Sequence, residues 1–159
     1  MKNIFNTKTI SLFLAFVIIL SFTYIQPVCA ADYSNITLTE EETELIASLV
    51  YHETKGEPLL SKMCFYAMIL NRLKNENFPN DVRKVVYDCG AFDSAMKGKL
   101  SRLPSREEMK TELGALTTVI KNNVDPTCGA LFTMKKDDPC LWEIMVLFTV
   151  EDRVFGIVT

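Results

Sequence analysis

A single glutamate lies where the sequence pattern favours an apolar side chain. Leu45, Ile46, Leu49 and Val50 recur at the spacing that places side chains on one face of an α-helix. Glu53 follows Leu49 by four residues and therefore extends the same face. An unpaired carboxylate in apolar surroundings is costly when ionised, so we expect the pKa of Glu53 to be raised. A carboxyl group that keeps its proton near neutral pH is a suitable general acid for breaking a glycosidic bond.

The residues around Glu53 leave other interpretations open. Gly56 and Pro58 end the helix just beyond it, so Glu53 lies either at the rim of the core or in a frayed, solvated last turn. Glu57 is either a second catalytic carboxylate or, as we prefer, a residue whose hydrogen bonds fix the loop. His52 is the one histidine of the chain, and it points away from its neighbour Glu53 on a helix. No cysteine lies in a recognisable nucleophile context, which disfavours a cysteine peptidase.

The elements that would position Glu53 are mainly helical. A capping box at Thr39–Glu42 predicts a helix over residues 40–54. A second helix over residues 59–74 contains eight consecutive apolar residues, which is typical of a central, buried helix. A short helix is expected over 81–87, followed by a loop over 89–94. A second capping box at Ser105–Glu108 opens a helix whose predicted apolar stripe is Met109, Leu113, Leu116 and Ile120.

The pattern changes beyond Gly129. The composition predicts extended strands over residues 131–134, 145–150 and 154–158. Glu151-Asp152 is expected to form a turn between the last two. No internal repeat or linker divides the chain. The sequence therefore predicts one α+β domain, mainly helical, with a small antiparallel β element at its C-terminal end.

The first thirty residues have the features of a secretory signal peptide. Lys2 and Lys8 precede an apolar run, and Val28-Cys29-Ala30 is a small-residue end. The run is short for a membrane span of ~20 residues, which argues against a retained anchor. Lipoprotein processing at Cys29 is disfavoured because no small residue precedes that cysteine. We expect cleavage after Ala30 and a secreted, extracytoplasmic domain over residues 31–159, with no membrane association after cleavage.

Charge and cysteine content restrict the function further. Removing two lysines with residues 1–30 changes the net charge from −3 to −5, which disfavours binding to nucleic acid or to an anionic membrane. Four cysteines then remain and allow three pairings, of which Cys128 with Cys140 is the first to test. Cys64 is expected to be a buried free thiol. Cys89 is the fourth of the remaining cysteines. One histidine and no C-x-x-C spacing argue against zinc, and no metal or organic cofactor is expected.

The segment Val50–Pro58 resembles a family signature. It reads V-Y-H-E-T-K-G-E-P and is similar to the V-Y-x-E-x-x-G-E-P of the spore-cortex-lytic cell-wall hydrolases (SleB/CwlJ type). Further short motifs follow in the family's order, so the resemblance covers roughly residues 45–155. They are Leu70-Asn71-Arg72, Phe78-Pro79, Val85-Val86-Tyr87, Gly90-Ala91-Phe92, Asp125-Pro126-Thr127, Gly129-Ala130-Leu131-Phe132, Pro139, Trp142 and Val154-Phe155.

The resemblance implies a lysozyme-like or lytic-transglycosylase-like fold and a catalytic acid at Glu53. The implied substrate is the glycan strand of peptidoglycan, with spore cortex and vegetative wall both open as its source, cut between N-acetylmuramic acid and N-acetylglucosamine. Attack by the sugar's own hydroxyl needs no second carboxylate, whereas attack by water favours a partner such as Glu57 or Asp93. We favour the first, transglycosylase route. The rival hypothesis is a non-catalytic secreted module that binds cell wall.

Further site residues follow from the same resemblance. Tyr51, Phe92 and Phe132 are candidates to line a sugar groove, with packing in the core as the alternative for each, and Glu57 is a candidate for substrate binding. The chain departs from the family where Met134 and Arg153 replace histidines that many members carry. We expect a monomer whose partner is the glycan strand.

Overall fold

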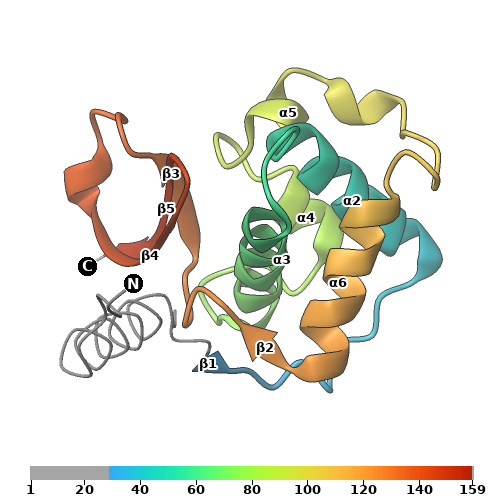
Figure 1. Cartoon of the computed structure of the whole chain (residues 1–159), viewed down its shortest axis with the longest axis horizontal. Coiled ribbons are helices and arrows are strands. Elements are labelled where there is room, and N and C mark those ends of the chain that lie inside the picture. The colour runs from blue at the N-terminus through green and yellow to red at the C-terminus, as the bar shows by residue number, and fades with distance from the viewer. Residues whose placement is uncertain (1–28, 159) are drawn as a thin grey trace, which may run out of the picture.

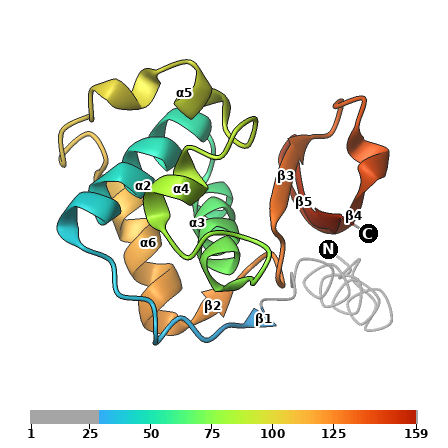
Figure 2. The same ribbon diagram turned by 180° about the vertical axis from the view of Figure 1, so that it is seen from behind.

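The computed structural model describes residues 29–158, and the segment 1–28 of the predicted signal peptide lies outside this range. Figure 1 shows a body of helices with a small sheet at its side, and Figure 2 shows the same arrangement from behind. None of the helices in the described range is long and apolar enough to cross a membrane. The helices of four or more residues are α2 (Glu40–Glu53), α3 (Leu59–Lys74), α4 (Val82–Val86), α5 (Asp93–Met96) and α6 (Lys110–Asn122).

Helix α3 is the centre of the helical body, as its apolar run predicts. Every residue from Cys64 to Leu70 is buried. Helices α2, α4 and α6 all pack against it. A helix with apolar residues on nearly all sides needs such neighbours, because a single partner would leave apolar area in water.

Helix α2 begins as the capping box predicts. The Thr39 side chain accepts a hydrogen bond from the Glu42 amide at 3.2 Å, and the Glu42 carboxylate accepts from the Thr39 amide at 2.8 Å. Leu45, Leu49 and the rest of the predicted apolar face are buried. The helix ends at Glu53, with Thr54 as its C-cap.

Three predictions about local structure need correction. The Ser105–Glu108 capping box forms, but residues 106–109 are a turn, and α6 begins at Lys110. The buried face of α6 consists of Glu112, Ala115, Leu116 and Val119. Glu112 can be buried because it forms an ion pair with Lys62, which a pattern of apolar residues does not reveal. The expected loop over 89–94 is also shortened, since α5 begins at Asp93.

The predicted C-terminal antiparallel element is confirmed. Strands β3 (Phe132–Lys135), β5 (Arg153–Val158) and β4 (Ile144–Val150) form a three-stranded sheet in that order, with η2 (Leu141–Glu143) before β4. A Cβ at Gly156 would collide with the main-chain carbonyl of Met145, so the central strand needs glycine there. The tight β4–β5 turn places Arg153 at the start of β5. The fold is α+β and mainly helical, as predicted.

A second, very small sheet joins the start of the described chain to the end of α6. Strand β1 (Cys29–Ala30) pairs with β2 (Val124–Asp125). Cys29 forms a disulfide with Cys128, with a Cα–Cα distance of 5.1 Å. The predicted Cys128–Cys140 pair is therefore wrong, because strand pairing brings Cys29 beside Cys128 and leaves Cys140 exposed. Cys64 is a buried free thiol, as expected.

Candidate active site

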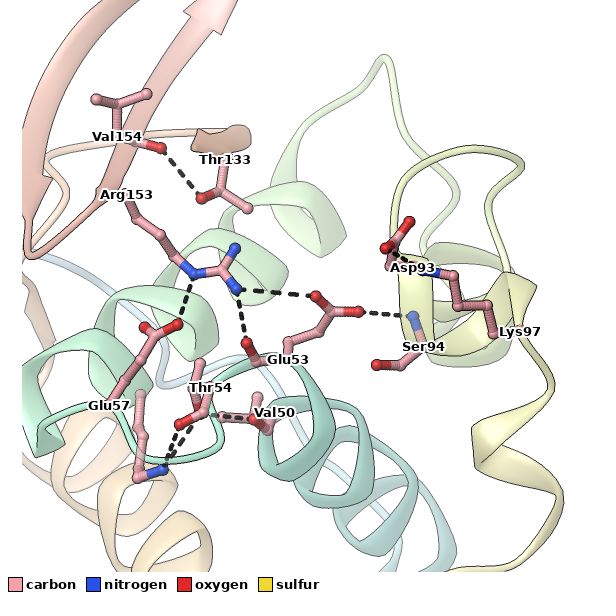
Figure 3. Close-up of polar contacts among 11 residues, drawn as sticks. Val50, Glu53, Thr54, Glu57, Asp93, Ser94, Lys97, Thr133, Arg153 and Val154 are labelled. Atoms are coloured by element: carbon pink, nitrogen blue, oxygen red, sulfur yellow. Dashed lines mark hydrogen bonds and ion pairs between the residues drawn. The ribbon is translucent and has the colours of Figure 1, made fainter. Parts of the chain in front are cut away.

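Glu53 lies sheltered at the C-terminal end of α2. Its side chain is 10% exposed. The amide of Ser94, in the first turn of α5, donates to Glu53 Oε1 at 2.7 Å, and Figure 3 shows the two residues facing each other. The predicted place of Glu53 at the end of a buried helix face is confirmed, and a solvated, frayed position is excluded.

The expectation of an unpaired carboxylate in apolar surroundings is wrong. The β4–β5 turn returns Arg153 to the end of α2, where Nη2 lies 4.0 Å from Glu53 Oε2. The same Nη2 donates to the main-chain carbonyl oxygen of Glu53 at 2.6 Å. The amide of Ser94 faces Oε1 and the guanidinium of Arg153 faces Oε2, so each carboxyl oxygen has a polar neighbour. The carboxyl group therefore occupies a polar, preorganised environment between two elements that are distant in sequence.

Glu57 lies on the other side of the same arginine. Its Oε1 accepts a hydrogen bond from Arg153 Nε at 2.9 Å, and the Glu57 side chain is 18% exposed. Its Oε2 is buried and has no hydrogen-bond partner within residues 29–158. The Glu57 carboxylate therefore joins the loop after α2 to β5 through the Arg153 side chain, and not through the backbone hydrogen bonds that we expected (Figure 3).

A buried ion pair supports the turn that follows Glu53. Lys62 Nζ lies 2.8 Å from Glu112 Oε1, and both side chains are less than 10% exposed. The same ammonium donates to the carbonyl oxygen of Thr54 at 3.1 Å and to its hydroxyl at 3.2 Å. The last carbonyls of a helix lack intrahelical donors, and cations stabilise that end. Arg153 and Lys62 thus cap two successive carbonyls at the end of α2.

Asp93, the other candidate for a second acid, is engaged at the surface. Its side chain is 74% exposed and lies 2.6 Å from Lys97 Nζ. The hydrogen bond and charge of Lys97 hold the pKa of Asp93 below its ordinary value. Asp93 is therefore ionised and paired at neutral pH.

The aromatic candidates lie in three different environments. Phe92 is 2% exposed and packs in the core near Phe65, so it has the packing role that the sequence left open. Phe132 is partly exposed on β3, with its ring 5.9 Å from that of Phe78. Tyr51 lines a separate hollow with His52 and residues 102–105.

Burial and the nearby Lys99 and Lys55 lower the pKa of His52, which favours its neutral form.

Ser94, Arg153 and Lys62 were absent from the predicted site. One feature of the sequence could have pointed to Arg153: it replaces a histidine that is common in the family that the motifs resemble. Ser94 acts through its backbone amide, which no residue type encodes. Lys62 lies within a helical pattern that gave no reason to expect it in the core.

The fold is similar to that of two solved catalytic domains. The catalytic domain of the Bacillus cereus SleB protein superposes with a TM-score of 0.64 at 28% identity, covering 76% of this chain and 93% of that one. The catalytic domain of the germination-specific lytic transglycosylase SleB from Bacillus anthracis gives the same score and identity, with 97% of that chain covered.

Sequence comparison identifies the family. The cell wall hydrolase family model matches residues 56–155, and the chain belongs to this family. The spore cortex-lytic enzyme of Bacillus cereus is 33% identical over 99 residues, which are 62% of this chain and 36% of the relative. That of Bacillus subtilis (strain 168) is 31% identical over 107 residues, 65% and 33% of the two chains. The chain thus spans about a third of the length of these relatives. The family match begins at Gly56, so Tyr51 and Glu53 lie just before it.

Proposed function

We propose that this chain cleaves the glycan strands of peptidoglycan between N-acetylmuramic acid and N-acetylglucosamine, with Glu53 as general acid and then general base. The observation that carries the proposal is the geometry at Glu53. Its carboxyl group is sheltered, fixed by the Ser94 amide through Oε1, and leaves Oε2 beside Arg153. Membership of the cell wall hydrolase family and similarity to spore cortex-lytic enzymes support the same substrate class.

The proposed reaction uses one carboxyl group twice. Glu53 donates its proton to the glycosidic oxygen as the bond from that oxygen to C1 of N-acetylmuramic acid breaks, which releases the N-acetylglucosamine residue with a free hydroxyl. The resulting Glu53 carboxylate then accepts the proton of the C6 hydroxyl of the muramic acid residue. The C6 oxygen bonds to C1, and a 1,6-anhydro end forms with no water consumed.

The state of the other two carboxylates favours this route over hydrolysis. An inverting hydrolase needs a second carboxylate to activate water, and a retaining one needs it as a nucleophile. Glu57 is paired with Arg153, and Asp93 is paired with Lys97. Glu57 is held by a partly buried arginine and Asp93 lies exposed at the surface, whereas the intramolecular route requires neither acid.

Mass spectrometry of the products tests the proposal. Purified protein is incubated with peptidoglycan and with spore cortex, and the released fragments are examined for anhydromuramic or reducing ends. We expect anhydro ends from the wild-type protein and none from Glu53→Gln. Glu41→Gln, an exposed acid on the same helix, is the matched control and should retain full activity.

Two outcomes would overturn parts of the proposal. Reducing N-acetylmuramic acid ends in place of anhydro ends would establish hydrolysis and exclude the transglycosylase route. If wild type and Glu53→Gln both bind the wall but release nothing, the chain is a binding module and not an enzyme.

A further inference from the structure

Arg153 contacts three oxygen acceptors at and just beyond the end of α2. It contacts the carbonyl of Glu53 through Nη2, the carboxylate of Glu57 through Nε and, at 4.0 Å, the carboxylate of Glu53. A planar guanidinium with donors in fixed directions can hold two such partners at once. Figure 3 shows Arg153 between the two acids.

The arginine is itself held in place. Its side chain is 11% exposed, and its guanidinium carbon lies 4.8 Å from the centre of the Phe65 ring on the central helix α3. Its backbone belongs to β5, the middle strand of the C-terminal sheet. The sheet and the helical core therefore determine together where the guanidinium lies, and the guanidinium contacts the residue that carries the acid.

We propose that Arg153 is a positioning residue with two roles: it fixes Glu53 for proton transfer, and it keeps Glu57 out of the chemistry. This inference rests on the proposed function of Glu53. Arg153 acts through the two glutamates and is not a proton donor, since an arginine stays protonated at all working pH values. The C-terminal sheet is thereby part of the catalytic apparatus, although the proposed acid lies on a helix.

Four variants test the two roles. Arg153→Met keeps an unbranched apolar stem and removes the charge and the donors. Arg153→Lys restores the charge with one compact group, and Glu57→Gln removes the paired carboxylate. Arg83→Met is the matched control, because Arg83 forms an exposed pair with Glu41. For each variant, kcat and apparent KM on solubilised peptidoglycan are measured with the melting temperature.

We expect Arg153→Met to lower kcat about 100-fold, the effect of a misplacement of ~1 Å at a reacting group. Its KM should stay within about threefold of the wild-type value, because no binding contact is removed. Arg153→Lys should have a kcat about tenfold higher than that of Arg153→Met, since an ammonium replaces the charge but not both directed donors. Glu57→Gln should lower kcat less than about tenfold, because it has no part in proton transfer.

Three results would contradict the inference. A melting temperature lowered in Arg153→Met, with kcat unchanged below the transition, would reduce Arg153 to a structural role. A loss in Glu57→Gln as complete as that in Glu53→Gln would make Glu57 a second catalytic acid. A rise in KM with kcat unchanged would make Arg153 a substrate-binding residue. Activity retained in Glu53→Gln would instead refute the proposed function itself, so the two failures are distinguishable.

Discussion

The guanidinium of Arg153 donates to the main-chain carbonyl of Glu53 at 2.6 Å, across one hundred residues of sequence. This contact joins the start of β5 to the last residue of α2. It places a fixed positive charge at a helix end whose carbonyls carry partial negative charge. The position of the proposed acid therefore depends on the folding of both the helical body and the small sheet.

Shortening the proposed acid should separate its position from its chemistry. Glu53→Asp keeps the carboxyl group but withdraws it by one methylene, away from the Ser94 amide that now lies 2.7 Å from Oε1. We expect kcat to fall about 100-fold, with the fold unchanged. The measurement is turnover on solubilised peptidoglycan with a circular dichroism melt. Full activity in Glu53→Asp would show that the contact with Ser94 has no catalytic importance.

The buried pair under the active-site turn should be sensitive to the loss of one partner. Lys62→Met leaves the Glu112 carboxylate buried without its cation, which we expect to cost about 3–5 kcal/mol of unfolding free energy. The double variant Lys62→Met/Glu112→Leu should recover most of this loss, because no buried charge remains. Urea denaturation measures both. If the single and double variants are equally destabilised, the contacts of Lys62 with Thr54 dominate and the ion pair does not.

The disulfide should stabilise the domain strongly, because it closes a long loop. Cys29 and Cys128 are separated by 99 residues, and a bridge of this kind contributes about 2–4 kcal/mol. We expect Cys128→Ser to lose roughly this amount in oxidised protein, measured by urea denaturation. Cys140→Ser, at an exposed free cysteine, is the control and should change stability by less than about 0.5 kcal/mol. Equal stability of the two variants would contradict the pairing.

The buried thiol should make the protein less stable at alkaline pH. Burial raises the pKa of Cys64 well above its ordinary value of 9.0, so the folded state keeps this group protonated. The unfolded chain ionises at the ordinary value, and stability is therefore fully present below pH 9 and falls as the pH rises above it. The slope contributed by one group is at most about 1.4 kcal/mol per pH unit. Denaturation at a series of pH values should show a shallower decline in Cys64→Ala, and an identical decline would be evidence against this origin.

The helices over residues 39–54 and 59–74 could be predicted because their apolar periodicity and capping residues are visible in the sequence. The same periodicity located Glu53, since a charged residue on an apolar face is visible without a structure. Its neighbours could not be found that way. The Ser94 contact uses a backbone amide, and the Arg153 contact depends on how a sheet folds back onto a helix.

Two errors in the sequence interpretation share one physical cause. The predicted stripe of α6 contained apolar residues alone, yet an ion pair with Lys62 allows Glu112 to be buried. Cys29 was assigned to the cleaved leader and left out of the possible pairings, yet the two-residue strands β1 and β2 bring it beside Cys128. Both depend on contacts between distant segments, which local pattern does not report.

The link between Cys29 and Cys128 also bears on maturation. Cleavage after Ala30 would cut the backbone between Cys29 and the rest of the domain. The disulfide would then hold the leader to Cys128 through sulfur alone, unless processing takes place upstream of Cys29. The N-terminal residue of the purified protein, read by intact-mass measurement, reveals which of the two forms the cell makes.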